Sequence, residues 1–192
     1  MNDTKIDLNR FVSRAGEKLQ FALETFNIDV KGKVCADLGA NAGGFTDSLL
    51  QNDASKVYCV DTGYGVLDWK LRNNPQVIPM ERTNALYVKL PEKVDLVVID
   101  VGWTKQEKIL PKAYELLKEK GEIVSLVKPH YEATTLIKKE RLTSEEAEQI
   151  VNSLVEKEKS AGRNIVGIVK SPIEGKKAGN IEYLIYLKKN SL

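Results

Sequence analysis

The stretch VCADLGANAGGFTDSLL, residues 34–50, predicts a short buried strand, a glycine-rich turn and the start of a helix. Val34, Cys35 and Ala36 form an apolar strand, which Asp37 is expected to end. The glycines that follow let the backbone turn tightly and approach a ligand without an intervening Cβ. The helix after the turn would direct free N–H groups and the positive end of its dipole toward the same place. Together these features predict a ligand site at the end of the strand.

A second acidic residue stands at the end of the next predicted strand. KVYCVD, residues 56–61, ends in Asp61, about 20 residues beyond the glycine turn. A carboxylate at that place accepts hydrogen bonds from the ribose hydroxyls of a nucleotide cofactor. The strict G-x-G-x-x-G fingerprint is absent, because the order here is Asp-x-Gly-Ala-Asn-x-Gly-Gly. A tight turn that binds nothing is the alternative interpretation.

The rest of the chain repeats the pattern of strand and helix. The further predicted strands span residues 77–80, 94–100, 122–128, 164–169 and 181–187. Repeated βα units predict a parallel, doubly wound sheet, and two consecutive strands at the end predict one antiparallel C-terminal strand. The expected fold class is therefore α/β and Rossmann-like. Ligands of such sheets bind at the carboxyl ends of the strands.

Residues that cap helices suggest where three of the helices begin or end. Ser13 is expected to cap a helix through residues 18–26. A second helix is expected over residues 107–119, closed by Lys120 and Gly121. A third is expected to begin at residue 143 or 144, where a hydroxyl cap precedes several glutamates.

The composition limits the class of protein. The 192 residues are 42% apolar and 29% charged, as in a globular α/β domain, and the net charge of +2 neither demands nor excludes nucleic acid. No apolar run approaches the ~20 residues of a membrane span, and MNDTKIDLNR lacks the apolar core of a secretory signal. Two cysteines in predicted buried strands favour free thiols in a reducing cytoplasm. We expect a cytoplasmic protein with a flexible segment 1–10 and a single domain 11–192. With one histidine and no Cys/His cluster at metal-ligand spacing, no metal site is predicted.

Four charged residues occupy positions where packing rarely places charge. Lys128 ends a buried strand, Asp100 ends the neighbouring strand, and Glu182 begins the last strand inside an apolar run. Lys18 lies on the first predicted helix. These residues are candidates for chemistry at the sheet edge. Two salt bridges on the rim are the alternative interpretation.

Seven segments together resemble the TlyA branch of the FtsJ/RrmJ-type RNA 2′-O-methyltransferases, the hemolysin A family. The matching segments are SRAGEKL, DLGANAGGFTD, YCVDTGYGVLDWKLRNNP, ERTN, VDLVVID, GEIVSLVKPHYEA and GNIEYLIYL. They keep the order and spacing of the family from Phe11 onward. The resemblance implies the class I methyltransferase fold, S-adenosylmethionine (AdoMet) as donor, and a ribose 2′-hydroxyl of RNA, in particular ribosomal RNA, as acceptor.

The resemblance also implies roles for individual residues. It implies a catalytic tetrad of Lys18, Asp100, Lys128 and Glu182. It implies AdoMet contacts from Asp37, Gly39, Ala40, Asn41, Gly43, Gly44, Phe45, Asp61, Thr83, Asn84 and Asp100. The glycine turn would hold the methionine portion, the acid after the second strand the ribose, and the Thr-Asn pair the adenine. A plain turn role is equally open for that asparagine.

The reaction itself sets what the tetrad must do. Methyl transfer is an in-line displacement, so the acceptor oxygen must lie ~3 Å from the methyl carbon. Lys128 is the candidate to orient that hydroxyl or to take its proton, and both roles stay open. Trp103, His130 and Tyr131 are expected on the substrate rim. Trp103 could stack on an RNA base or equally cover the sheet edge.

Two departures from the family pattern bear on the substrate. Ten residues precede Phe11, where the branch usually carries a small S4-type RNA-binding domain, so that module is expected to be missing. A separate RNA-binding chain or a homodimer could supply the docking. Val101-Gly102-Trp103 stands where the family commonly has Val-Ser-Phe, which could reshape the acceptor pocket.

Three other functions compete with RNA methylation. One is AdoMet-dependent methylation of a small hydroxyl compound. Another is a catalytically silent AdoMet-binding subunit that needs an RNA-binding partner. The third, the membrane lysis that the hemolysin label suggests, is disfavoured because the sequence has no span and no evident basic amphipathic helix.

Overall fold

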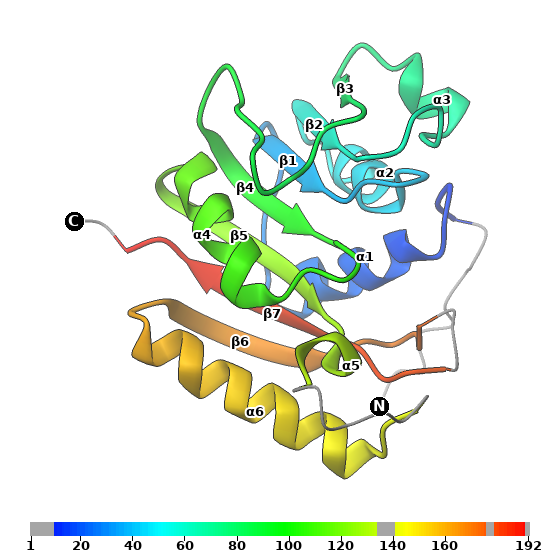
Figure 1. The fold of residues 1–192 in the computed structure, drawn as a ribbon. Helices are drawn as coiled ribbons and strands as arrows, with labels where there is room; N and C mark the ends of the chain where they lie inside the picture. The colour runs from blue at the N-terminus through cyan, green and yellow to red at the C-terminus, as the bar shows by residue number, and fades with distance from the viewer. Residues whose placement is uncertain (1–9, 134–140, 176–178, 191–192) are drawn as a thin grey trace.

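The strands of the computed structural model pair into one mixed sheet in the order β3-β2-β1-β4-β5-β7-β6 (Figure 1). The structure describes residues 10–133, 141–175 and 179–190. The strands are β1 Val34–Leu38, β2 Lys56–Val60, β3 Val77–Met80, β4 Val94–Ile99, β5 Leu117–Val127, β6 Asn164–Lys170 and β7 Tyr183–Lys188. The helices are α1 Ala15–Thr25, α2 Gly44–Gln51, α3 Trp69–Arg72, α4 Gln106–Leu116, α5 Pro129–Glu132 and α6 Ser144–Ser160.

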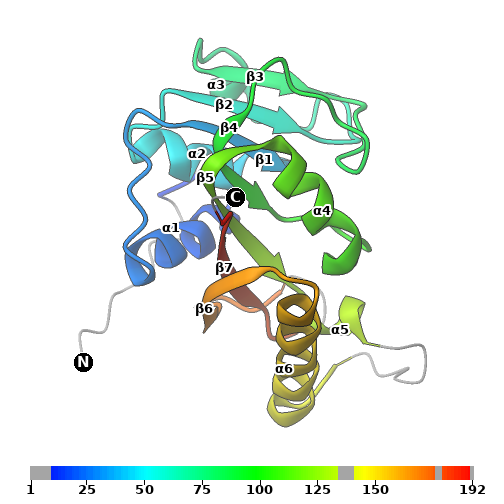
Figure 2. The ribbon, with the colours of Figure 1, turned by 90° about the vertical axis from the view of Figure 1, so that its left-hand side faces the viewer.

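The directions of the strands confirm the predicted doubly wound α/β fold. Strands β1 to β5 pair in parallel, whereas β7 lies antiparallel between β5 and β6. Parallel strands need helical crossovers, and these place helices on both faces of the sheet. In Figure 2, α1 and α2 lie on one side of the sheet and α4 and α6 on the other.

Each face of the sheet has its own hydrophobic core. Leu19 of α1 and Leu49 of α2 pack with alternate side chains of β1 and β4 on one face. Leu110 of α4 and Val151 of α6 pack on the other. The strand VDLVVI of β4 is buried on both faces, which explains why its sequence is almost continuously apolar.

The register of the parallel strands brings their carboxyl ends to one edge. Leu38 of β1 pairs with Val60 of β2 and with Ile99 of β4, and Ile99 pairs with Ser125 of β5. The residues that follow these strands therefore meet at the same edge, as the sequence predicts.

Three predicted strand boundaries are wrong. The last strand, expected over residues 181–187, is β7 and begins at Tyr183, so Glu182 precedes it. Strand β1 continues through Asp37 to Leu38, because Thr46 satisfies the buried carboxylate with two hydrogen bonds. Strand β5 begins at Leu117, where a helix over residues 107–119 is expected. Leu117 pairs with Val94 of β4, so the segment joins the sheet before an irregular stretch.

Of the two predicted N-caps, one is wrong and one is confirmed. Ser13 does not cap α1 with its side chain: Arg14 holds the N-cap position, and the Ser13 carbonyl accepts from Gly16 N at 3.0 Å. For α6 the predicted cap is confirmed, since Thr143 and Glu146 form a capping box. Most of the segment 1–10, expected to be flexible, lies outside the described residues.

Candidate active site at the carboxyl edge of the sheet

A cavity of about 500 Å³ opens at the carboxyl ends of β1, β2, β4 and β5. Its volume falls within the range of small-molecule sites. Predicted site residues that line it are Lys18, Asp37, Gly39, Ala40, Asn41, Phe45, Asp61, Thr83, Asn84, Asp100, Lys128 and Glu182. The fold thus brings most of the expected cofactor residues and the four charged residues to one hollow.

The glycine turn after β1 forms the floor of the cavity. Gly39 has a φ of 91°, and a Cβ there would lie 2.5 Å from the Asp100 carbonyl oxygen. Only glycine permits this approach between the ends of β1 and β4. Asn41 N donates to Asp61 Oδ2 at 2.8 Å, and Gly63 N donates to Asp61 Oδ1 at 2.7 Å. The Asp61 carboxylate therefore joins the glycine turn to the loop after β2.

Asp37 is a fully buried carboxylate with one oxygen unused. Its Oδ2 accepts from Thr46 N at 3.0 Å and from Thr46 Oγ1 at 2.7 Å. Its Oδ1 has no hydrogen-bond partner among the residues that the structure describes, although Asp37 lines the cavity. Burial raises the pKa of Asp37 from 3.8 to about 7, against the hydrogen bonds of Thr46 and together with the negative charges of Asp100 and Asp61. Such an orphaned oxygen suits a cationic group of a ligand.

Asp37→Asn should change how stability depends on pH. The folded protein holds a proton on Asp37 up to about pH 7, whereas the unfolded chain releases it near 3.8. This group therefore stabilises the fold most below about pH 4, and its contribution is lost as the pH rises through about 7. Urea unfolding at pH 5 and pH 8 should show that the variant gains stability relative to wild type at pH 8. An equal change in the free energy of unfolding between pH 5 and pH 8 in both proteins would contradict the raised pKa of Asp37.

The four charged residues form two ion pairs. Lys18 Nζ on α1 pairs with Glu182 Oε2, which precedes β7. Lys128 Nζ pairs with Asp100 Oδ1 at 2.5 Å and also donates to the Val101 carbonyl oxygen at 3.3 Å. Lys18 and Glu182 are 5% and 4% exposed, so this pair is buried and is no rim salt bridge.

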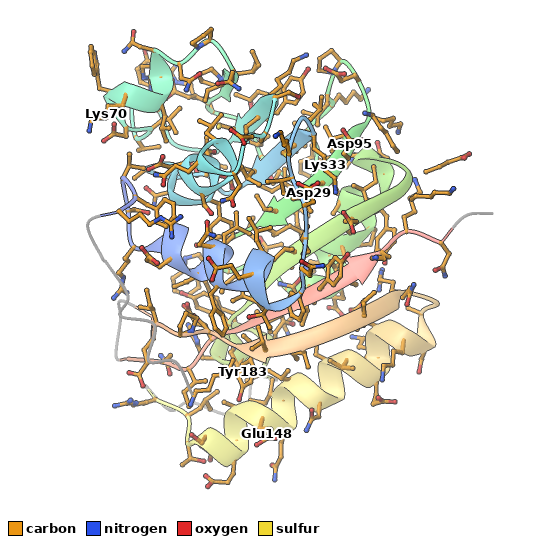
Figure 3. All side chains as sticks on the ribbon, turned by 180° about the vertical axis from the view of Figure 1, so that it is seen from behind. Asp29, Lys33, Lys70, Asp95, Glu148 and Tyr183 are labelled. Carbon is orange, nitrogen blue, oxygen red and sulfur yellow. The ribbon has the colours of Figure 1, made fainter. Side chains whose placement is uncertain are left out.

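The amino-terminal edge of the sheet carries other charges. Lys33 and Asp95 lie there, away from the cavity (Figure 3). Lys33 Nζ pairs with Glu122 at 2.7 Å, and Asp95 accepts from Val34 N at 2.9 Å. These contacts tie strand starts together and line no part of the cavity described above.

Five predicted site residues lie outside the lining of the cavity. Gly43 and Gly44 are close-packed instead: a Cβ on Gly43 would meet the Leu71 side chain at 2.3 Å, and one on Gly44 the Ser13 hydroxyl at 2.2 Å. The others are Trp103, His130 and Tyr131.

These three aromatic residues form a cluster beside the cavity. The Trp103 and Tyr131 rings lie 4.9 Å apart, and the His130 and Tyr131 rings 3.9 Å apart. Trp103 is 80% exposed, so it does not cover the sheet edge. Burial, with the nearby positive charge of Lys128, lowers the pKa of His130. A contact with RNA from this cluster stays a prediction.

Sequence reasoning missed several lining residues. These are Ser13, Arg14, Ala15, Ala42, Val60, Thr62, Ala85, Leu86, Thr104 and Ile109. Val101 and Gly102, from the segment expected to shape the acceptor pocket, also line the cavity. Arg14 is the charged one, and it has no ion-pair partner among the described residues. It precedes Lys18 by four residues, which on a helix means the same face. The four-residue spacing from Lys18 could therefore have identified Arg14 as a site residue.

Two further properties concern only the described ranges 10–133, 141–175 and 179–190. Within them, no three or more His, Cys, Asp or Glu side chains gather in a group that could hold a metal ion. No helix in these ranges is long and apolar enough to cross a membrane. Both cysteines are free and buried, and burial raises the pKa of Cys35 to about 12.

Comparison with known proteins identifies the family. Residues 11–189 match the family of FtsJ-like methyltransferases. The chain is 37% identical over 189 residues to the 16S/23S rRNA (cytidine-2′-O)-methyltransferase TlyA of Mycobacterium tuberculosis, covering 93% of this chain and 68% of that protein. It is 39% identical over 188 residues to Hemolysin A of Brachyspira hyodysenteriae, covering 92% and 76%.

Solved structures agree with this assignment. A candidate hemolysin from Streptococcus thermophilus superimposes with a TM-score of 0.90 at 35% identity, over 99% of this chain and 70% of that one. The N-methyltransferase NodS from Bradyrhizobium japonicum, in complex with S-adenosyl-L-homocysteine, shares the fold with a TM-score of 0.64 at 15% identity, over 99% and 94%. The chain therefore belongs to the FtsJ-like methyltransferases, in their TlyA-like branch, and is an AdoMet-dependent methyltransferase.

Proposed function

We propose that this protein transfers the methyl group of AdoMet to a ribose 2′-hydroxyl of RNA, with ribosomal RNA as the substrate. The observation that carries the proposal is the ion pair between Lys128 and Asp100. Both residues line the cavity whose floor is the glycine turn. The name of the TlyA relative, an rRNA (cytidine-2′-O)-methyltransferase, supports the ribose acceptor and the RNA class.

The cofactor would lie across the ends of β1 and β2. When bound, AdoMet supplies an electrophilic methyl group on a sulfonium. The positive charge of its methionine ammonium would favour the ionised form of Asp37, whose free Oδ1 would then accept from that ammonium in a charge-assisted contact. Asp61 would contact the ribose, although backbone N–H groups already occupy one site on each of its oxygens. Thr83 and Asn84 would adjoin the adenine.

Lys128 would hold the acceptor hydroxyl. An ammonium has three N–H donors, and two of them point at Asp100 Oδ1 and at the Val101 carbonyl. The third is left for the acceptor oxygen, which favours the orienting role over proton removal. Asp100 fixes the direction of Lys128, and Glu182 does the same for Lys18. The rate would then come mainly from proximity and alignment.

Arg14→Ala should weaken RNA binding and leave AdoMet binding unchanged. Arg14 lines the cavity without a carboxylate partner in the described part of the chain, so an RNA phosphate is the expected partner of its guanidinium. Loss of one phosphate contact should reduce the slope of log K against log salt by about 1. Filter binding at several salt concentrations measures that slope. Lys31→Ala, before β1 at the opposite edge, is the matched control, and an equal effect there would refute the assignment.

Labelled AdoMet incubated with total RNA and with ribosomal subunits tests the function. Digestion to nucleosides should release a labelled 2′-O-methylnucleoside. AdoMet binding without RNA labelling would contradict the proposal and favour a small hydroxyl acceptor or a silent subunit. Addition of cell extract to that reaction separates the two. Only a subunit that needs a second RNA-binding chain should then label RNA, above the labelling by extract alone. Light scattering at the same time reports whether the chain is a homodimer.

A further inference from the structure

We propose that Gln106 is a positioning residue that holds the acceptor-side wall of the cavity, residues 101–105, against β5. This inference rests on the proposed function, because it assigns that wall to the RNA side of the site. Gln106 is the first residue of α4 and is 2% exposed. It lines no part of the cavity, so it would act through the segment before it.

Three hydrogen bonds fix Gln106. Its side-chain Oε1 accepts from Ser125 Oγ at 2.7 Å, and its Nε2 donates to the Leu126 carbonyl oxygen at 3.2 Å. Its backbone N donates to Glu132 Oε1 at 2.9 Å. Ser125 is fully buried as well. The start of α4 is therefore tied to β5 a few residues before Lys128, and to the end of α5 a few residues after it.

These contacts fix the chain on both sides of the Asp100–Lys128 pair. Strand pairing of Ile99 with Ser125 fixes the backbones next to Asp100 and Lys128. The segment 101–105 between β4 and α4 belongs to no strand or helix. Lys128 holds its beginning through the Val101 carbonyl, and Gln106 holds its end. Gly102 and Thr104 of this segment line the cavity, so its position shapes the acceptor side.

The conformation of Trp103 shows why the segment needs an anchor. Trp103 has a φ of 61°, a left-handed conformation that a bulky side chain rarely adopts. Its ring is 80% exposed and contacts Tyr131. A strained, exposed residue keeps its conformation only where the surrounding contacts impose it. Gln106 and Lys128 supply those contacts from the two ends.

A purely structural role for Gln106 is the competing explanation, and Gln20 provides the matched control. Gln20 on α1 is also buried, 7% exposed, and its Oε1 accepts from Asn52 Nδ2 at 2.7 Å. It lies outside the lining of the cavity. Gln20→Leu and Gln106→Leu remove the same chemical group from the interior, and only the second lies beside the acceptor wall.

The test compares these two variants in the full chain. For Gln106→Leu we expect kcat/KM for RNA to fall roughly tenfold or more, because small misplacements of reacting groups are costly. The Kd for AdoMet should stay within about twofold, since the contacts lie away from β1 and β2. Gln20→Leu should lower Tm and keep kcat/KM. An RNA kcat/KM for Gln106→Leu within about twofold of wild type, or an equal loss in Gln20→Leu, would overturn the proposal.

Fluorescence gives a readout that is independent of activity. Trp69→Phe leaves Trp103 as the single tryptophan. In that background, Gln106→Leu should change acrylamide quenching of Trp103 and Gln20→Leu should not; no change in either would refute the anchoring.

Gln106→Glu keeps an acceptor for Ser125 and regains its donor only when protonated. Its RNA activity relative to wild type should therefore rise as the pH falls, and a constant ratio would count against the proposal. If wild type methylates no RNA, the proposed function fails while the Trp103 signal still decides this inference.

Discussion

Lys128→Met should reduce kcat for RNA methylation by about 10³-fold while AdoMet still binds within about twofold of wild type. The Lys128 ammonium has two fixed acceptors, Asp100 and Val101, and one donor left for the acceptor oxygen. Methionine keeps the length of the side chain and removes every donor. Single-turnover methyl transfer measures kcat, and calorimetry measures the Kd of AdoMet.

Two further substitutions make this result specific. Lys108→Met on the exposed side of α4 removes a charge of the same kind and should leave kcat unchanged. Lys128→Arg retains donors on a group that stays protonated, so an orienting role predicts partial activity and a general-base role predicts none. Full activity of Lys128→Met would remove Lys128 from the mechanism.

Glu182→Ala should destabilise the fold by about 3–5 kcal/mol, because it leaves the Lys18 ammonium buried without its partner. Both side chains are nearly inaccessible, so water cannot replace the lost carboxylate. Urea unfolding measures the loss. Glu156→Ala breaks an exposed pair with Lys159 on α6 and should leave the free energy of unfolding nearly unchanged.

A double substitution separates stability from catalysis at this pair. Lys18→Met with Glu182→Leu replaces the buried ions by apolar groups of similar size, which should restore most of the lost stability. If Lys18 and Glu182 serve methyl transfer, the stable double variant should still lack activity. Recovery of both stability and activity would make the pair structural only.

The sequence by itself determined the order of strands and helices, the parallel sheet and the edge at which the site lies. Strand, turn and helix signals are local, and in parallel sheets the carboxyl ends share one edge, so Asp61, Asp100 and Lys128 were predicted to meet. Contacts between distant segments could not be read in this way. Lys18 and Glu182 lie 164 positions apart, and only the insertion of β7 beside β5 makes them partners.

Tertiary structure also decided which local preferences prevailed. A helical pattern reaches residue 119, yet pairing of Leu117 with Val94 converts the end of that segment into β5, because strand hydrogen bonds and burial outweigh helix propensity. Asp37 would end an isolated strand, but Thr46 on α2 supplies the hydrogen bonds that let the carboxylate be buried. The anchoring of Gln106 on Ser125 and Leu126 depends likewise on the packing of α4 against β5. Sequence periodicity therefore placed the site, whereas long-range pairing and burial decided which charges face each other in it.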